Sequence, residues 1–420
     1  MSCIHGYAKA IQINMKVLYL TYDGLSDPLG QSQVMPYLLK LADKGFSITI
    51  ISFEKKTMFT GAFEDIKKKL DEKKISWVPL NYTSRPPVLS TIFDIIKLKR
   101  QCIRLQKIHH YRIVHCRSYI TSFAGMMMKQ KFGLKFIFDM RGFYADERVE
   151  GGLWNQNKII FRYVYNYFKK KEKLFFRNAD KTVTLTEAAK EIIVGQFSVP
   201  KMKVKVIPCC VDTSLFNPAA INSQLQSQVR KRLSIKEKDF VISYLGAIGT
   251  WYLLDEMLGL FKQLSDRFPD AKFLFITYHP RVLILESAFK LNIPVEKIIV
   301  EKAGRNEVPL LLSLSSLSLF FIKQTFSKIA SSPTKQAEIL AMGIPLICNT
   351  HIGDTEAIVT RSGAGLLINQ FTINEFDKVI NGIPTLLQKD KTEIRNFAIH
   401  EFSLERGVDA YNEIYLELKK

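Results

Sequence analysis

The sequence lacks several patterns by which a function is often recognised. Its six cysteines form no Cys-x-x-Cys pair and no spacing typical of a disulfide framework, so we expect reduced thiols. Its seven histidines form no His-x-x-His or His-Glu-x-x-His arrangement, and no Asp-x-Asp motif is present to hold a metal against a diphosphate. We therefore expect no metal site and no cofactor.

Long hydrophobic runs are also missing. No stretch approaches eighteen uninterrupted apolar residues, which argues against a transmembrane helix. Residues 1–14 lack a charged segment followed by an apolar one, so they do not indicate a secretion signal. Because the first strand-like run starts near Met15, we interpret residues 1–14 as a dispensable extension. These absences together predict a cytoplasmic protein.

Acidic residues are few compared with basic ones, 40 against 60, and the formal net charge is +20. Such an excess favours an anionic partner: nucleic acid, an anionic membrane surface or phosphorylated substrates. No helix-turn-helix, zinc-finger or aromatic RNA-binding motif is present, which argues against nucleic acid. Residues 158–177 contain seven basic and seven aromatic residues and one acid, a composition typical of the interface of an anionic leaflet. The alternative for this segment is a core helix with a basic outer face.

Strand-like and helix-like patterns alternate along the chain, which predicts parallel α/β sheets. The alternation stops in a polar stretch and then restarts, so we predict two doubly wound domains, at 15–212 and 236–400. Residues 213–235 are the expected linker, and 401–420 the expected closing helix. In such domains ligands bind outside the carboxyl ends of the strands, in the cleft between the domains.

The expected strands are short apolar runs between turn residues. A helix with apolar residues at i, i+3, i+4 and i+7 is expected from Val34 to Leu41, ending at Gly45. The strands are 17–21, 47–53, 75–80, 112–117, 135–140, 181–186 and 203–208 in the first half, and 240–245, 272–277, 297–300, 317–322, 345–348 and 365–368 in the second.

One helix start in the second half is of special interest. Ser332 is the predicted N-cap and Pro333 the first helical residue. The free N–H groups and the macrodipole at such an end favour an anion, for example a phosphate. Thr334 and Glu338 would share one helix face, with Lys335 beside them. Together these residues could bind both the phosphates and the hydroxyls of one ligand. The alternative is an ordinary surface helix with a solvated lysine and glutamate.

Five segments carry a family resemblance, in the same order along nearly the whole chain: VLYLTYDGLSDPLGQSQVMPYLLKLADKGF, DMRGFYADERVEGGLW, VIPCCVDTSLFNP, YLGAIGTWY and SSPTKQAEILAMGIPLICNTHIGDTE. The chain resembles a glycosyltransferase of family 4, group 1. Members of that family adopt the GT-B fold, two Rossmann-like domains facing across a cleft. The resemblance implies metal-independent transfer of a sugar from a nucleotide-diphosphate sugar, with the anomeric configuration retained.

The acceptor is expected to be a lipid-linked or growing glycan of surface polysaccharide biosynthesis. The basic charge and residues 158–177 place that acceptor at a membrane, so we expect a peripheral protein at the inner face of the cytoplasmic membrane. A GT-B-fold nucleotide-sugar epimerase, or a nucleotide-sugar binder without transferase activity, is the alternative. A dinucleotide oxidoreductase is disfavoured, because no Gly-x-Gly-x-x-Gly follows any expected strand; GAIG at 246–249 comes nearest.

The chain also departs from the family pattern. Glu338 matches the second glutamate of the family's pair, which usually contacts the nucleotide ribose, whereas the first would fall at Ala330. The usual Arg and Lys that clasp the diphosphate are missing from GAIGTWYLLDEM. Lys328 and Lys335 are expected to substitute for them, together with Arg141, whose planar guanidinium suits phosphate contact.

For Arg141 the alternative is a structural ion pair with one of three nearby carboxylates, Asp139, Asp146 and Glu147. The predicted catalytic residues are Arg141 and Glu338. The predicted donor-binding residues are Gly30, Gln31, Gly246, Thr250, Lys328, Ser331, Ser332, Thr334, Lys335 and Glu338.

Overall fold

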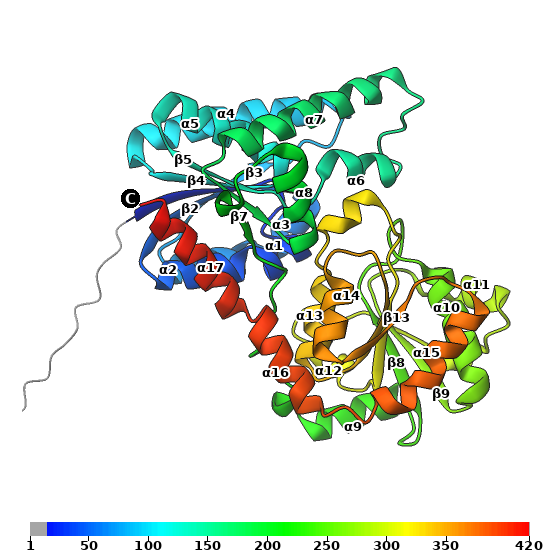
Figure 1. Ribbon diagram of the computed structural model, residues 1–420. Helices are drawn as coiled ribbons and strands as arrows, with labels where there is room; N and C mark the ends of the chain where they lie inside the picture. The colour runs from blue at the N-terminus through cyan, green and yellow to red at the C-terminus, as the bar shows by residue number, and fades with distance from the viewer. Residues whose placement is uncertain (1–14, 420) are drawn as a thin grey trace, which may run out of the picture. The chain divides into compact units, whose positions relative to one another are not determined.

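The computed structural model describes residues 15–419 and contains two parallel sheets (Figure 1). The predicted extension, 1–14, lies outside the described residues. The first sheet has seven strands in the order β3-β2-β1-β4-β5-β6-β7, and the second has six in the order β10-β9-β8-β11-β12-β13. In each sheet the chain starts at an inner strand and winds outward in both directions, so the predicted doubly wound α/β class is confirmed.

All thirteen expected strands are present, with ends that differ by a few residues from the predicted ones. Those of the first sheet are β1 Met15–Thr21, β2 Phe46–Glu54, β3 Ser76–Asn81, β4 Ile113–Arg117, β5 Lys135–Asp139, β6 Lys181–Thr184 and β7 Val204–Val206. Those of the second are β8 Phe240–Leu245, β9 Ala271–Ile276, β10 Ile298–Glu301, β11 Leu317–Phe320, β12 Leu346–Asn349 and β13 Gly365–Ile368.

The central strands are buried along their whole length, as strands covered by helices on both faces must be. Every residue of β4 and of β11 is buried. This explains why these strands read as short continuous apolar runs rather than as an alternating pattern.

Helices connect the strands. In the first half of the chain they are α1 Pro28–Gln33, α2 Met35–Asp43, α3 Lys56–Glu72, α4 Leu89–His109, α5 Ser118–Phe132, α6 Tyr144–Glu150, α7 Ile159–Asn178 and α8 Glu187–Phe197. The second half contains α9 Ser223–Arg232, α10 Leu254–Arg267, α11 Arg281–Lys290, α12 Val308–Leu312, α13 Thr334–Ala341, α14 Thr355–Ser362, α15 Ile373–Leu386, α16 Lys391–Phe402 and α17 Leu404–Glu417. Short 3₁₀ helices lie at η1 Lys201–Lys203, η2 Pro218–Ala220, η3 Val295–Lys297 and η4 Phe326–Ala330.

The helix expected between Val34 and Leu41 is present as α2. It buries Tyr37, Leu38 and Leu41, and Gly45 follows it with φ of +92°. The helix begins only at Met35, because Val34 has a non-helical backbone (φ −124°, ψ −65°) between α1 and α2.

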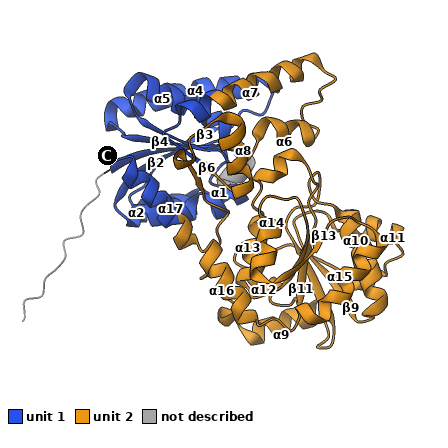
Figure 2. Ribbon diagram, in the orientation of Figure 1, with its two compact units in different colours: residues 1–140, 174–182, 408–420 blue, residues 141–173, 183–407 orange. Residues whose placement is uncertain are grey.

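The chain forms two compact units, coloured separately in Figure 2. Within the described residues, unit 1 comprises 15–140, 174–182 and 408–419, and unit 2 comprises 141–173 and 183–407. The polar stretch 213–235 is not unstructured, since it contains η2 and α9, both started by asparagine caps. In unit 2, α10 and the strands of the six-stranded sheet contribute to one large apolar core.

The second sheet brings three loops to one edge. In the order β10-β9-β8-β11, the strands β10, β8 and β11 are close neighbours and run parallel. The loops after their carboxyl ends therefore gather at the same edge of the sheet. They carry Arg305, Gly246 and the segment that leads from η4 into α13.

Candidate active site

Helix α13 starts one residue later than predicted. Its N-cap is Pro333, with an extended backbone (φ −66°, ψ 113°), and its first helical residue is Thr334. The prediction that Ser332 caps the helix is wrong: its hydroxyl oxygen accepts a hydrogen bond from the Cys209 N–H at 3.1 Å. Local pattern alone does not reveal a backbone donor more than 100 residues away that competes for the serine oxygen.

The helix is buried along almost its whole length, from Lys335 to Ala341. Lys335 is 6% exposed and Glu338 4% exposed. The alternative of a surface helix with solvated charges is therefore wrong. Charged side chains are almost never buried without a partner, so their partners define the site.

Lys335 lies in an aromatic pocket formed by the β8 region. Its Nζ donates a hydrogen bond to the Tyr244 hydroxyl at 3.1 Å and lies 3.7 Å from the centre of the Tyr252 ring. Both contacts favour an ammonium group. Burial nevertheless lowers the pKa of Lys335 well below the ordinary lysine value, while the charge of Glu338 opposes this shift.

Gly246 leaves room for the lysine. A Cβ at this position would lie 2.8 Å from the Lys335 Nζ, and the backbone has φ of +121°. A glycine is thus required both by the close approach and by the backbone conformation. The structure brings together two of the predicted donor-binding residues that are 89 positions apart in the sequence.

Glu338 forms an ion pair with Arg305, which follows β10. The guanidinium of Arg305 also stacks over the Phe216 ring, 4.6 Å from its centre. Burial raises the pKa of Glu338. The positive charge of Arg305, and to a smaller extent that of Lys335, opposes this increase. Sequence reasoning missed Arg305, although it follows a strand end in a loop with a glycine, a place where ligand contacts are expected.

Lys328 in η4 is also engaged. Its Nζ lies 2.8 Å from a carboxylate oxygen of Glu147 and 3.6 Å from the centre of the Trp251 ring. The neighbouring Ser327 N–H donates to Glu150 at 3.0 Å. The end of α6 therefore holds the segment that precedes α13. Thr250, next to Trp251, is exposed.

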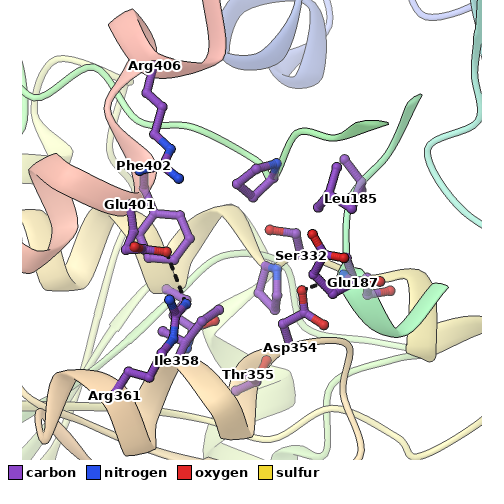
Figure 3. Close-up of a pocket in the computed structure, with 16 residues that line it drawn as sticks. Leu185, Glu187, Ser332, Asp354, Thr355, Ile358, Arg361, Glu401, Phe402 and Arg406 are labelled. Carbon is purple, nitrogen blue, oxygen red and sulfur yellow. Dashed lines mark hydrogen bonds and ion pairs between the residues drawn. The ribbon is translucent and has the colours of Figure 1, made fainter. Parts of the chain in front are cut away.

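Ser331 and Ser332 lie on the other side of α13. They line a cavity of about 250 Å³ within unit 2 (Figure 3). Gln336 lines it too, and lies two positions before Glu338, or about 200° around the helix. The cavity is lined by Leu185, Thr186, Glu187, Val206, Pro208, Ser331, Ser332, Pro333, Gln336, Asp354, Thr355, Ile358, Arg361, Glu401, Phe402 and Arg406.

Two sets of polar contacts involve residues that line this cavity (Figure 3). Arg361 donates to Glu401 at 3.0 Å. Asp354 accepts hydrogen bonds from the N–H groups of Glu187 at 2.7 Å and Ala188 at 3.1 Å, and so joins the starts of α14 and α8. Asp354 of the family-like segment thus has a structural role, which the sequence did not indicate.

Gly30 and Gln31 belong to α1 of unit 1, which follows a tightly folded turn. A Cβ on Gly30 would lie 2.1 Å from the Gly24 carbonyl oxygen, and the Gln31 amide donates to the Leu25 carbonyl at 2.6 Å. The buried Glu54 accepts hydrogen bonds from the Leu25 N–H at 2.8 Å and the Ser26 hydroxyl at 2.6 Å. Glu54 therefore organises this loop, a role that the sequence did not indicate.

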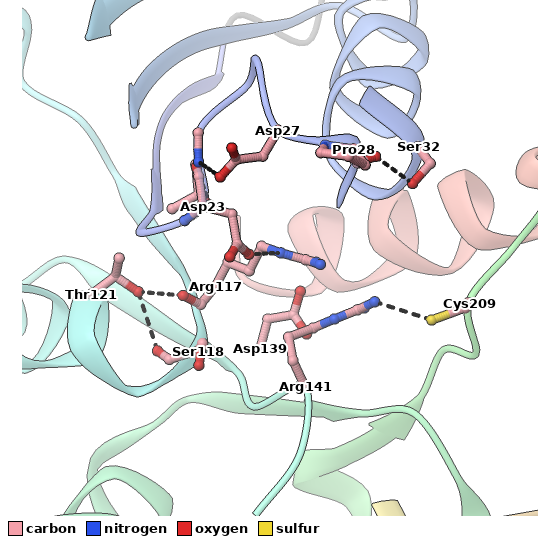
Figure 4. Close-up of polar contacts among 12 residues, drawn as sticks. Asp23, Asp27, Pro28, Ser32, Arg117, Ser118, Thr121, Asp139, Arg141 and Cys209 are labelled. Atoms are coloured by element: carbon pink, nitrogen blue, oxygen red, sulfur yellow. Dashed lines mark hydrogen bonds and ion pairs between the residues drawn. The ribbon is translucent and has the colours of Figure 1, made fainter. Parts of the chain in front are cut away.

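Arg141 has a left-handed backbone with φ of +61°. Its Nη2 lies 3.4 Å from the Cys209 sulfur (Figure 4). Two of the carboxylates considered as its structural partners bind lysines instead: Asp146 pairs with Lys169 and Glu147 with Lys328, each at 2.8 Å. In unit 1, Arg117 pairs with Asp23 at 3.2 Å (Figure 4).

Comparison with known proteins relates this fold to glycosyltransferases. Residues 32–215, somewhat less than half of the chain, match the sequence model of Glycosyltransferase Family 4. The chain thus resembles the group 1 glycosyltransferases of that family, and its two parallel sheets are those of the GT-B fold.

Individual relatives are distant in sequence. An Escherichia coli UDP-Gal:alpha-D-GlcNAc-diphosphoundecaprenol alpha-1,3-galactosyltransferase is 21% identical over 345 residues, which are 79% of this chain and 83% of that protein. A glycosyltransferase structure from Rickettsia africae superposes with a TM-score of 0.71 at 17% identity, over 97% of this chain and 99% of that one. The Anabaena protein HepE in complex with UDP-glucose gives a TM-score of 0.68 at 14% identity, over 96% and 100%.

Proposed function

We propose that this glycosyltransferase moves a hexosyl group from a nucleotide-diphosphate sugar to a lipid-linked or growing glycan acceptor in surface polysaccharide biosynthesis. Transfer proceeds with retention and without a metal. The observation that carries the proposal is the buried Lys335 and Glu338 of α13, beside the loops at the carboxyl ends of β8 and β10. A buried base and acid at that edge of a parallel sheet suit the phosphates and hydroxyls of one nucleotide.

The proposed roles follow from charge and reach. Glu338, oriented by Arg305, accepts hydrogen bonds from the ribose hydroxyls. Lys335 and Lys328 neutralise the diphosphate, whose negative charge grows as the sugar leaves, and such stabilisation is often the largest catalytic contribution. A phosphate oxygen of the leaving group then takes the acceptor's proton, so that no protein carboxylate acts as the base.

The remaining predicted residues have supporting roles in this proposal. Arg141 adds positive charge near the donor as the second catalytic residue. The other proposed donor contacts are Gly30, Gln31, Gly246, Thr250, Ser331, Ser332 and Thr334.

The lipid-linked acceptor rests on two observations. The E. coli relative is named for a diphosphoundecaprenol acceptor. In addition, α7 presents exposed aromatic and apolar side chains, among them Ile159 and Tyr163, between basic residues. We propose a peripheral protein at the inner face of the cytoplasmic membrane. Among residues 15–419, we find no helix with the length and apolar character that crossing a bilayer requires.

The test is Glu338→Gln, measured by the thermal shift on adding UDP, GDP, ADP or CMP and by sugar transfer. A ligand that binds only the folded state raises its stability, so the preferred nucleotide raises the melting temperature of the wild type. Loss of a charged acceptor for ribose hydroxyls weakens binding by about 1.5–3 kcal/mol, that is, roughly tenfold or more.

Glu393→Gln is the matched control, because Glu393 lies on α16 with an exposed side chain that pairs with Lys389. Unchanged nucleotide affinity and turnover in the Glu338 variant would exclude the proposed role. A product formed from the nucleotide sugar alone, without any acceptor, would favour the epimerase alternative instead.

A further inference from the structure

Helix α4 of unit 1 has apolar side chains on two sides. One side packs into the unit, through Ser90, Asp94, Leu98, Cys102 and Leu105. The other side is open to solvent: the exposed fractions are 63% for Leu89, 48% for Ile92, 55% for Phe93 and 42% for Ile96. Their spacing of i, i+3, i+4 and i+7 places the four on one stripe over two helical turns.

Single exposed apolar residues are normal on a protein surface, but a contiguous stripe indicates an interaction site. A folding role does not explain this stripe, because the opposite face of α4 already supplies the contacts with the core. The stripe also lies outside the segment 158–177.

Basic residues continue α4 beyond the stripe. Lys99, Arg100, Arg104 and Lys107 follow within the same helix, and Arg100, Arg104 and Lys107 are exposed. Asp94 is the single acid in the sequence of α4. It is buried and is neutralised inside the fold, where it pairs with Lys97 at 2.9 Å and accepts from the Thr83 hydroxyl at 2.7 Å.

We propose that Leu89, Ile92, Phe93 and Ile96 insert into the interfacial region of an anionic bilayer, while the basic end of α4 binds lipid phosphates. An apolar stripe followed by cations, with no exposed acid on the helix, is the pattern of helices that lie in a membrane surface. A second copy of the chain is a poorer occupant, because two such basic faces, each on a chain with a net charge of +20, repel one another. The inference deepens the proposed function, since it places unit 1 where a lipid-linked acceptor resides.

The experiment is co-sedimentation of the full chain with phosphatidylcholine vesicles containing about one-third phosphatidylglycerol. The variant Ile92→Ser/Phe93→Ser/Ile96→Ser is expected to bind roughly tenfold or more weakly, because three apolar side chains no longer leave water. A matched control removes three exposed apolar side chains from α11 of unit 2: Val282→Ser/Leu283→Ser/Phe289→Ser. It is expected to bind as the wild type does.

A second variant, Arg100→Gln/Arg104→Gln, leaves the apolar stripe in place. Its binding is expected to fall several-fold and to depend less on salt, because surface charges act through a screened field. This variant keeps the test decisive if the triple serine variant does not fold. Thermal unfolding of each variant verifies the fold.

Three results would overturn the proposal. The first is wild-type binding by both α4 variants. The second is loss of binding only in Ile159→Ser/Tyr163→Ser/Tyr167→Ser, which alters the exposed side of α7. The third is a wild-type dimer that binds no vesicles and that the α4 serine variant converts to a monomer.

Failure of the sugar-transfer proposal is separable from failure of this one. With an acceptor analogue that lacks the lipid tail, the α4 serine variant is expected to retain wild-type transfer. If no nucleotide sugar supports transfer while vesicle binding behaves as described, the transfer proposal fails and the membrane face of α4 stands.

Discussion

Lys335 and Glu338 carry opposite charges in an interior where neither charge is favoured. Burial lowers the pKa of the lysine and raises the pKa of the glutamate, and each group partly opposes the shift of the other. Arg305 adds a second positive charge beside the glutamate. Buried charges with shifted pKa values cluster at functional sites. A diphosphate next to Lys335 would favour the charged form of the lysine and so raise its pKa.

Replacing Lys335 tests how much the burial of its ammonium group lowers the free energy of unfolding. Below the lowered pKa of Lys335 in the folded protein, both states are protonated and the full penalty of burying the ammonium is present. Between that pKa and the ordinary value of 10.5, the unfolded chain binds more protons, so wild-type stability gains from this group as pH rises.

We expect Lys335→Met to remove that gain. The difference in melting temperature, variant minus wild type, is then larger near neutral pH than near pH 10.5. The variant is also expected to lose donor binding. The measurement is thermal unfolding across this pH range. Lys378→Met, at an exposed lysine on α15, is the control. Parallel pH curves for the wild type and Lys335→Met would contradict the expectation.

At the scale of elements, each unit contains a turn whose backbone closely approaches groups from another segment. The loop after β8 turns at Gly246 with φ of +121°, and the Lys335 side chain passes directly beside it. The segment 24–31 of unit 1, a turn followed by the start of α1, is similarly compact, with the Glu54 carboxylate binding the Leu25 N–H and the Ser26 hydroxyl. In both segments a glycine allows a close approach that other residues would block.

We expect Gly246→Ala to displace Lys335 and to lower both stability and donor affinity. A Cβ there would lie 2.8 Å from Nζ, and the backbone conformation disfavours a side chain, which costs about 1–3 kcal/mol. Urea unfolding and nucleotide titration measure the two effects.

Gly195→Ala on α8 is the opposite case, because nothing lies within 4 Å of its added Cβ. Since alanine is the better helix former, this variant is expected to gain about 0.5–1 kcal/mol. A Gly246 variant as stable and active as the wild type would exclude the packing argument.

At the scale of the whole molecule, the C-terminal helix contacts strands of unit 1 that lie far from it in the sequence. Residues 408–419 belong to unit 1, which also contains His115, 300 positions before Tyr415 in the sequence. The Tyr415 hydroxyl and His115 Nδ1 are 2.7 Å apart, and the Tyr411 hydroxyl donates to Asp139 at 3.0 Å. Burial raises the pKa of Tyr415 well above the ordinary tyrosine value, so it stays neutral here.

Tyr415→Phe is expected to destabilise the protein by about 1–3 kcal/mol, because a buried imidazole nitrogen loses its hydroxyl partner. The urea midpoint of unfolding measures the loss. Tyr278→Phe, at a well-exposed tyrosine of unit 2, is the control and is expected to be neutral. Equal midpoints for both variants would mean that the hydroxyl contributes nothing to holding α17.

Much of the fold was predictable because its signals are local. A buried strand in a parallel sheet is a short apolar run, so all thirteen strands could be placed. The start of α13 was predicted to within one residue from Pro333. The stretch 213–235 was harder, because α9 has no buried residue and hence no apolar period to reveal it.

The sequence by itself determined the alternation of strands and helices, the family resemblance, and the choice of Lys335 and Glu338 as paired candidates on one short helix. Only the tertiary structure decided that both are buried, that Arg305 holds the glutamate, that Gly246 admits the lysine, and that Ser332 faces Cys209 rather than capping the helix. The physical reason is the distance along the sequence over which each kind of interaction acts. Periodicity and capping act over a few residues, whereas these contacts join segments tens to more than 100 positions apart, and only the folding of the sheet brings them together.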